Sequence, residues 1–90
     1  MACNITVYGL DNCEDTQRTR RYLEGRGVAY CYVNLEQDKA AEEMVKREND
    51  GKLRTPLVEA RVGTEARVLR VPTDERLENA IRDLEALDAA

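Results

Sequence analysis

Strand-type and helix-type segments alternate along most of this chain, and their order constrains the fold more than any other feature. Strands are predicted where β-branched, aromatic and other apolar residues gather between turn signals, at residues 4–8, 29–35, 57–62 and 65–71. Helices are predicted where apolar residues recur every three or four positions, at residues 13–24, 37–48 and about 74–87. A chain of 90 residues makes one domain with a modest core.

The connections between these segments indicate an α/β fold. A right-handed crossover through the first helix places the first two strands side by side and parallel. Gly63 and Thr64 form a two-residue turn, so the last two strands should pair as an antiparallel hairpin. The sum is a four-stranded mixed sheet with helices on both faces, in the order β-α-β-α-β-β-α.

One cysteine, Cys13, lies between the first strand and the first helix. Asn12 is a good helix N-cap and Asp15 can reach back as in a capping box, which places Cys13 in the first helical turn. Unpaired N–H groups and the positive end of the helix dipole favour an anion there, and the thiolate is the form of cysteine that attacks. The position is also the carboxyl end of a strand, where open α/β sheets place their sites. The alternative is a small buried apolar residue, as most free cysteines are.

The charge balance limits the class of partner. A net charge of −4 argues against nucleic acid, whose phosphates need a basic surface. Arg18, Arg20 and Arg21 form one basic patch, for which a solvated helix face is favoured over an anion site. There is neither an apolar run near the roughly 20 residues of a membrane span nor a signal-peptide pattern. We therefore expect a cytoplasmic protein that binds no membrane.

The cysteine count favours thiols over disulfides. The three cysteines are Cys3, Cys13 and Cys31, and an odd number in a small chain without a signal argues against a disulfide framework. Cys31 is interpreted as a packing residue. The chain has no C-x-x-C pair and no histidine, which argues against a structural zinc site and against proteolysis by a Cys-His pair. No metal site is expected.

Three stretches carry a resemblance to a known family. They are the run 5–8 followed by Cys13, the helical run 42–47, and Arg54-Thr55-Pro56 with the strand after it. With these the chain resembles the glutaredoxin family of the thioredoxin fold over nearly its whole length. The resemblance implies the strand order 2-1-3-4 and a cis peptide bond at Thr55–Pro56, facing Cys13. Residues 49–51 and 71–74 resemble the mycoredoxin-type branch.

The family pattern also assigns the site. Glutaredoxins read C-P-Y-C or C-G-F-S, whereas residues 13–16 read C-E-D-T, which implies a single-thiol mechanism. The implied catalytic residues are Cys13 and Thr16, whose hydroxyl would hydrogen-bond the thiolate. The implied substrate-binding residues are Asn12, Thr55, Pro56, Thr73 and Asp74.

Other departures bear on the co-substrate. Leu10 stands where the family often has the lysine that binds the glutathione carboxylate, and the usual Gly-Gly turn is missing. Asp11, Glu14 and Asp15 add negative charge around Cys13, which disfavours an anionic thiol such as glutathione. We expect a monomer that acts on protein or small-molecule mixed disulfides, with no cofactor and a low-molecular-weight thiol as co-substrate.

Opposing effects act on the thiol itself. The helix N-terminus and a hydroxyl bond from Thr16 should lower the pKa of Cys13, while Glu14 and Asp15 should raise it, and we expect the lowering effects to be narrowly larger. Three alternatives to an oxidoreductase stay open: a redox-inert adaptor, an iron–sulfur carrier, and an arsenate-reductase-like protein. The last rests on Cys13, Thr16 and Arg18, which approach a C-x-x-S-R pattern.

Overall fold

The computed structural model describes residues 3–88 and has a mixed α/β architecture. Its elements follow the predicted order: β1 (Ile5–Gly9), α1 (Glu14–Gly25), β2 (Cys31–Asn34), α2 (Lys39–Glu48), β3 (Leu57–Val62), β4 (Glu65–Arg70) and α3 (Asp74–Asp88). Among the described residues, no helix is long and apolar enough to cross a membrane. The thioredoxin-like fold class predicted from the sequence is confirmed.

The four strands form a single mixed sheet in the order β2-β1-β3-β4. β1 pairs with β2 in parallel and with β3 antiparallel, and β3 and β4 form the antiparallel hairpin. Gly63 has a φ of 65° in the hairpin turn, a backbone conformation that glycine adopts without strain. The predicted strand order and pairing are therefore correct.

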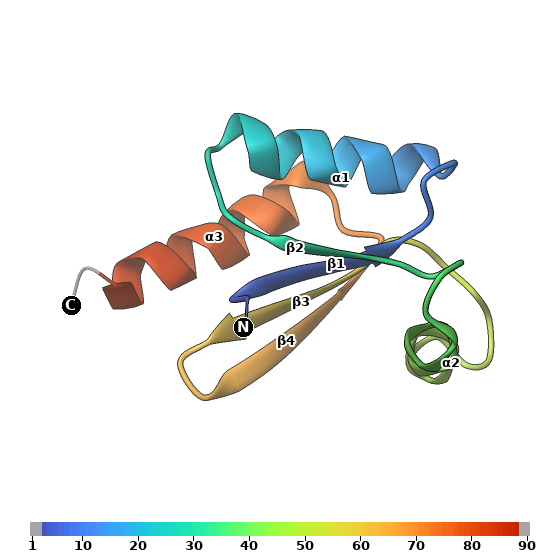
Figure 1. The fold of residues 1–90 in the computed structure, drawn as a ribbon. Helices are drawn as coiled ribbons and strands as arrows, with labels where there is room; N and C mark the ends of the chain where they lie inside the picture. The colour runs from blue at the N-terminus through green and yellow to red at the C-terminus, as the bar shows by residue number, and fades with distance from the viewer. Residues whose placement is uncertain (1–2, 89–90) are drawn as a thin grey trace.

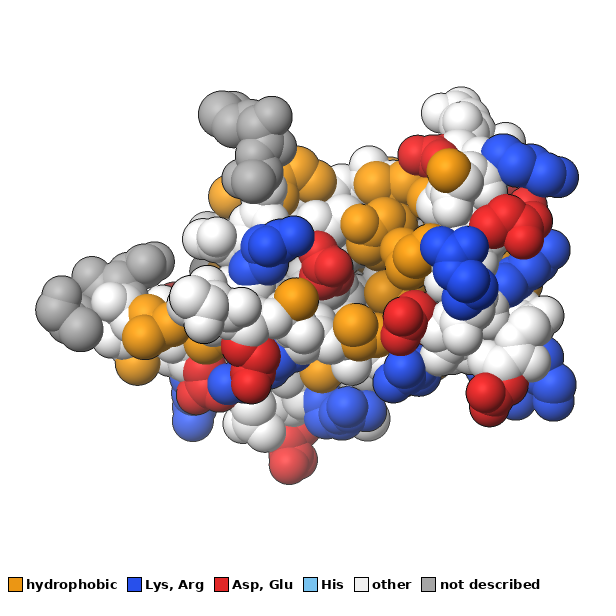
Figure 2. All heavy atoms as spheres, turned by 90° about the horizontal axis from the view of Figure 1, so that it is seen from below, with side chains coloured by type: hydrophobic (Ala, Val, Ile, Leu, Met, Phe, Trp, Pro, Cys, Tyr) orange, Lys and Arg blue, Asp and Glu red, His pale blue; other side chains and the backbone are white. Residues whose placement is uncertain are grey.

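Helices cover both faces of the sheet unequally. Figure 1 shows α1 and α3 on one face and only the short α2 on the other. Successive strand residues point to opposite faces, so Ile5 and Val7 are buried under α1 and α3, while Tyr8 packs toward α2. On the second face, apolar side chains gather beside α2 and are partly visible (Figure 2). The main core thus lies beneath α1, the helix that follows Cys13.

The start of α1 differs from the prediction. Cys13 itself occupies the N-cap position, with extended φ and ψ of −92° and 122°, and the helix begins one residue later than expected. The reason is a tight turn in which the Cys13 N–H donates to the Leu10 carbonyl at 3.1 Å. This turn places Asn12 at an exposed corner, so Asn12 is not the N-cap and the predicted capping box with Asp15 is wrong.

The expectation that the chain has no disulfide is also wrong. Cys3 and Cys31 are bonded to each other, with their Cα atoms 5.9 Å apart. The parallel pairing of β1 and β2 explains this, because it sets Thr6 opposite Cys31 and so brings the starts of the two strands together. Cys31 is thus a disulfide partner and not only a packing residue, and Cys13 is the free cysteine among the described residues.

Candidate functional site

The free thiol lies at the junction of the sheet and α1. Cys13 follows the carboxyl end of β1 and is partly exposed. As the N-cap residue it precedes the backbone N–H groups that α1 leaves without a helical partner. A sulfur in this position is accessible to a substrate and is next to several donors.

Thr55, in the loop before β3, contacts the Cys13 sulfur. The Thr55 hydroxyl donates a hydrogen bond to Cys13 Sγ at 3.0 Å, and the Cys13 S–H faces the Thr55 carbonyl oxygen at 3.6 Å. The Thr55–Pro56 peptide bond is cis. The structure therefore brings together Cys13 and Thr55, two predicted site residues that lie 42 positions apart in the chain.

Hydrogen bonds lower the pKa of the Cys13 thiol, although partial burial opposes them. Partial burial favours the neutral form and is the largest single influence on the Cys13 pKa. It is outweighed by the hydroxyls of Thr16 and Thr55 and by the backbone N–H groups of Thr16 and Asp15, so the pKa is lowered. The expected direction is confirmed. The hydrogen bonds lower the pKa against the effect of burial, and the Glu14 and Asp15 carboxylates are not among the causes.

Thr16 has a structural role as well. Its side chain is fully buried, and its hydroxyl accepts a hydrogen bond from the Leu10 N–H at 3.4 Å. A Cβ atom on Gly9 would lie 2.5 Å from Thr16 Cγ2 and 2.6 Å from its Oγ1, so β1 and α1 approach closely only because residue 9 is glycine. Thr16 thus supports the Cys13 loop from beneath and is not open to a substrate.

Asp11, in the loop between β1 and Cys13, links that loop to β2. The Asp11 carboxylate accepts hydrogen bonds from the Tyr32 hydroxyl at 2.7 Å and from the Asn34 side-chain amide at 3.2 Å. Gln17 donates to the Asp11 carbonyl at 2.9 Å. Partial burial, followed by the bond to Asp11, raises the pKa of Tyr32 to about 12. From the sequence, Asp11 is predicted only to add negative charge near Cys13. Its link to β2 depends on contacts with Tyr32 and Asn34, which lie 21 and 23 positions away in the chain.

The segment between β4 and α3 lies beside the same loop. The Val71 N–H donates to the Pro56 carbonyl at 2.9 Å, which places residues 71–74 next to the Thr55–Pro56 bond. The Thr73 hydroxyl accepts from the Arg76 N–H at 3.2 Å and so caps α3. Thr73 is exposed and its hydroxyl can still donate its own hydrogen, so its substrate-binding role stays a prediction.

Arg18, which the sequence places on a solvated helix face, is partly exposed on α1 and also links two elements. Its guanidinium donates to Asp74 Oδ1 at 2.6 Å and to the Pro72 carbonyl at 2.9 Å, and so joins α1 to the start of α3. The carboxylate of Asp74, a predicted substrate-binding residue, is therefore paired with Arg18. No sequence signal identified Arg18, because its partner lies 56 positions away.

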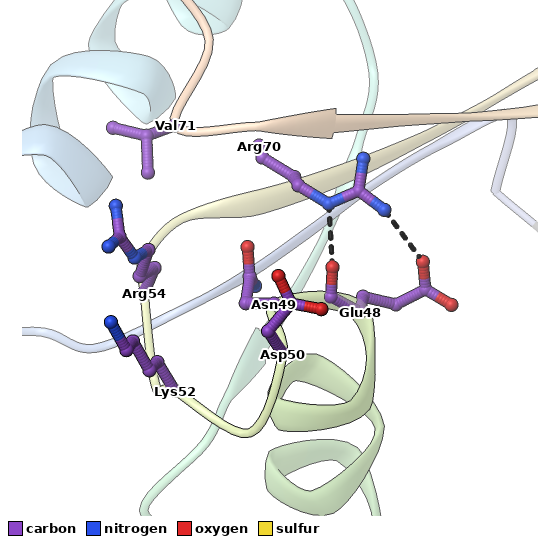
Figure 3. Close-up of a pocket in the computed structure, with 7 residues that line it drawn as sticks. All are labelled: Glu48, Asn49, Asp50, Lys52, Arg54, Arg70 and Val71. Carbon is purple, nitrogen blue, oxygen red and sulfur yellow. Dashed lines mark hydrogen bonds and ion pairs between the residues drawn. The ribbon is translucent and has the colours of Figure 1, made fainter.

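A charged cavity adjoins the Thr55 loop. It encloses about 570 Å³ and is lined by Glu48, Asn49, Asp50, Lys52, Arg54, Arg70 and Val71. In Figure 3, Arg70 is bound to Glu48 on one side and Lys52 and Arg54 lie on the other. Among residues 3–88, no group of three or more His, Cys, Asp and Glu side chains is placed to hold a metal ion.

The comparison with known families agrees with this geometry. The glutaredoxin family profile matches residues 5–61, more than half of the chain. The chain belongs to the glutaredoxin family. Its similarity to the mycoredoxin-type branch stays a prediction.

Two solved structures show the same architecture. A glutaredoxin (grx-1) from Archaeoglobus fulgidus has a TM-score of 0.66 at 21% identity, over 89% of this chain and 87% of that one. The glutaredoxin-like protein NrdH-redoxin from Escherichia coli has a TM-score of 0.59 at 27% identity, over 81% of this chain and 92% of that one. No curated protein sequence gives a significant match. Membership of the glutaredoxin family, with the similarity to NrdH-redoxin, supports a role like that of a thiol–disulfide oxidoreductase.

Proposed function

We propose that this glutaredoxin-family protein is a thiol–disulfide oxidoreductase that acts by a single-thiol mechanism through Cys13. The observation that carries the proposal is the partly exposed free thiol of Cys13, with the Thr55 hydroxyl 3.0 Å from its sulfur and its pKa lowered by hydrogen bonds. A lowered pKa enlarges the fraction of thiolate at neutral pH, and the thiolate is the attacking species. The proposed setting is the cytoplasm.

The reaction takes two exchanges. The Cys13 thiolate attacks one sulfur of a mixed disulfide, the substrate S–S bond breaks, and the leaving sulfur departs as a thiolate that takes a proton from water. Cys13 is then bonded to the other half of the substrate. An external low-molecular-weight thiol attacks that bond as its own thiolate, forms a new disulfide and releases Cys13. The external thiol is needed because residues 14–16 contain no second cysteine.

Thr55 and its neighbours provide the positioning. The Thr55 hydroxyl stabilises the Cys13 thiolate before attack and again when Cys13 leaves the mixed disulfide. The Thr55 carbonyl, 3.6 Å from Sγ, is placed to align an extended substrate backbone beside the sulfur. Pro56 and Asn12 lie next to this path, Pro56 through its bond to Thr55 and Asn12 at the exposed corner before Cys13. The protein acts as a monomer and uses no resident cofactor.

Trapping the intermediate tests the proposal. A Cys3→Ser/Cys31→Ser variant leaves Cys13 as its only cysteine, so any mixed disulfide must form there. With a peptide disulfide and no added thiol, we expect one adduct per chain by intact mass, and its loss when a small thiol is added. The control adds Cys13→Ser and should form no adduct. Slow alkylation of Cys13 with no adduct would contradict the proposal and favour a redox-inert adaptor.

A further inference from the structure

A pair of sulfurs apart from Cys13, those of Cys3 and Cys31, lies at the start of the two parallel strands. Cys31 is the first residue of β2, and Cys3 lies two residues before β1. Their Cα atoms are 5.9 Å apart, within the range of about 4.4–6.8 Å found for disulfides. The backbone of β1 and β2 therefore holds the two cysteines at bonding distance.

Both cysteines are accessible. Each is partly exposed, and so is every residue of β2. β2 is also an edge strand, paired on one side only, with β1. Because both residues are partly exposed, we expect an external small thiol or disulfide to reach their sulfurs.

This pair is separate from Cys13. Figure 1 shows the chain entering β1 at one end and reaching α1 from the other. The five residues of β1 span roughly 16 Å when extended, whereas a disulfide needs Cα atoms within about 7 Å. Cys13 of the same molecule therefore cannot exchange with the pair, and the electrons must come from another molecule.

We propose that Cys3 and Cys31 are a second, reversible thiol–disulfide site, which exchanges with small-molecule disulfides and thiols. On oxidation, one cysteine thiolate attacks a small disulfide and releases one small thiol, leaving a mixed disulfide on the protein. The other cysteine attacks that bond and releases the second small thiol. Two electrons and two protons pass from the protein to the small disulfide, and small thiols reverse the sequence.

The site's position links it to the Cys13 loop. The bond joins residues 28 positions apart and encloses β1, α1 and Cys13. It also fixes the start of β2, and Tyr32 and Asn34 of this strand hold the Asp11 carboxylate. Oxidation of the pair thus secures the edge strand that anchors the loop before Cys13.

The test uses the full chain with Cys13→Ser, so that only Cys3 and Cys31 carry sulfur that can react. Its result is independent of the chemistry proposed for Cys13. The protein is equilibrated with reduced and oxidised glutathione at varied ratios, and free thiols are alkylated and counted by intact mass. We expect both thiols to disappear together in a monomer, and to return without unfolding when the ratio is reversed.

Stability gives a second readout. Closing a loop of this size should raise the melting temperature of the oxidised protein by more than about 10 °C over the reduced protein. Hydrogen exchange in residues 31–34 should be slower in the oxidised form. A matched Cys3→Ser/Cys13→Ser variant, with Cys31 alone, should form only a mixed disulfide and show neither effect.

Three results would overturn the proposal. They are two free thiols at every glutathione ratio, a disulfide that thiols open only in unfolded protein, and oxidation that yields dimers rather than a bonded monomer.

Discussion

The two ends of β1 carry sulfur in opposite surroundings. At the carboxyl end, Cys13 has hydrogen-bond donors from α1 and from the loop before β3, but no partner cysteine. At the amino end, Cys3 and Cys31 have each other and lie at the start of an edge strand. One arrangement favours a thiolate and the other favours a disulfide. The contrast shows that neighbouring groups, rather than the cysteine residue itself, determine which chemistry each end of one short strand supports.

The largest expected effect is on thiol-transfer activity, which should depend on Cys13 at the carboxyl end of β1 and not on Cys3 and Cys31 at its amino end. In the Cys3→Ser/Cys31→Ser background, which leaves Cys13 as the only cysteine, adding Cys13→Ser should reduce thiol transfer to the uncatalysed rate, because it removes the nucleophile. Cys3→Ser/Cys31→Ser should keep the activity but lower the free energy of unfolding by about 3.5 kcal/mol, the value expected for a bond between residues 28 positions apart. Turnover of a mixed-disulfide substrate and urea unfolding under oxidising conditions measure the two effects. Equal loss of activity in both variants would remove the distinction.

The next effect concerns the close approach of β1 and α1 beneath Cys13. Gly9→Ala should destabilise the protein by about 2 kcal/mol or more, since the added Cβ would collide with Thr16, which is buried and has little room to move. Gly25→Ala is the matched control. Residue 25 has no atom within 4 Å of an added Cβ. Because it is the last residue of α1, the change there should stabilise the helix by no more than about 0.5–1 kcal/mol. Urea denaturation measures both, and equal effects at the two glycines would contradict the account.

Two buried threonines of α1 allow a finer comparison. Within the described part of the chain, Thr19 Oγ1 is buried and has no hydrogen-bond partner, whereas Thr16 Oγ1 accepts from the Leu10 N–H. Thr19→Val should therefore stabilise the protein by about 1 kcal/mol, and Thr16→Val should destabilise it by a similar amount. Unfolding curves of the two variants would show opposite shifts, and the interpretation fails if both shift in the same direction.

The smallest expected effect is a fall in the free energy of unfolding at low pH, caused by protonation of Glu78. Glu78 of α3 accepts hydrogen bonds from Arg26 and Tyr22 of the α1 region, which with Arg82 lower its pKa to about 2. Because the folded pKa is below the ordinary value of 4.5, the stabilisation is present above pH 4.5 and is lost as the pH falls toward 2. Glu78→Gln should flatten the decline of stability across this window. An unchanged pH profile in this variant would contradict the assignment.

Local patterns in the sequence were sufficient for most of the fold. Apolar spacing and turn residues gave the order of the elements, and the family resemblance gave the strand order and the pairing of Cys13 with Thr55. The wrong prediction that the chain has no disulfide concerns a contact between distant residues, Cys3 and Cys31. The Arg18–Asp74 pair and the link from Asp11 to β2 also join distant residues, and the sequence did not reveal them. The prediction that Asn12 is the N-cap was wrong for another reason. Asn12 lies inside the turn from Leu10 to Cys13, before the helix begins.

The pKa of Cys13 tests the central claim most directly. It can be measured from the ultraviolet absorbance of the thiolate against pH in the Cys3→Ser/Cys31→Ser variant, alone and combined with Thr55→Val or with the matched Thr55→Ser, which keeps the hydroxyl. The account predicts a pKa below that of an ordinary cysteine, raised by Thr55→Val and little changed by Thr55→Ser. A pKa at or above the ordinary value, or one that Thr55→Val leaves unchanged, would contradict it.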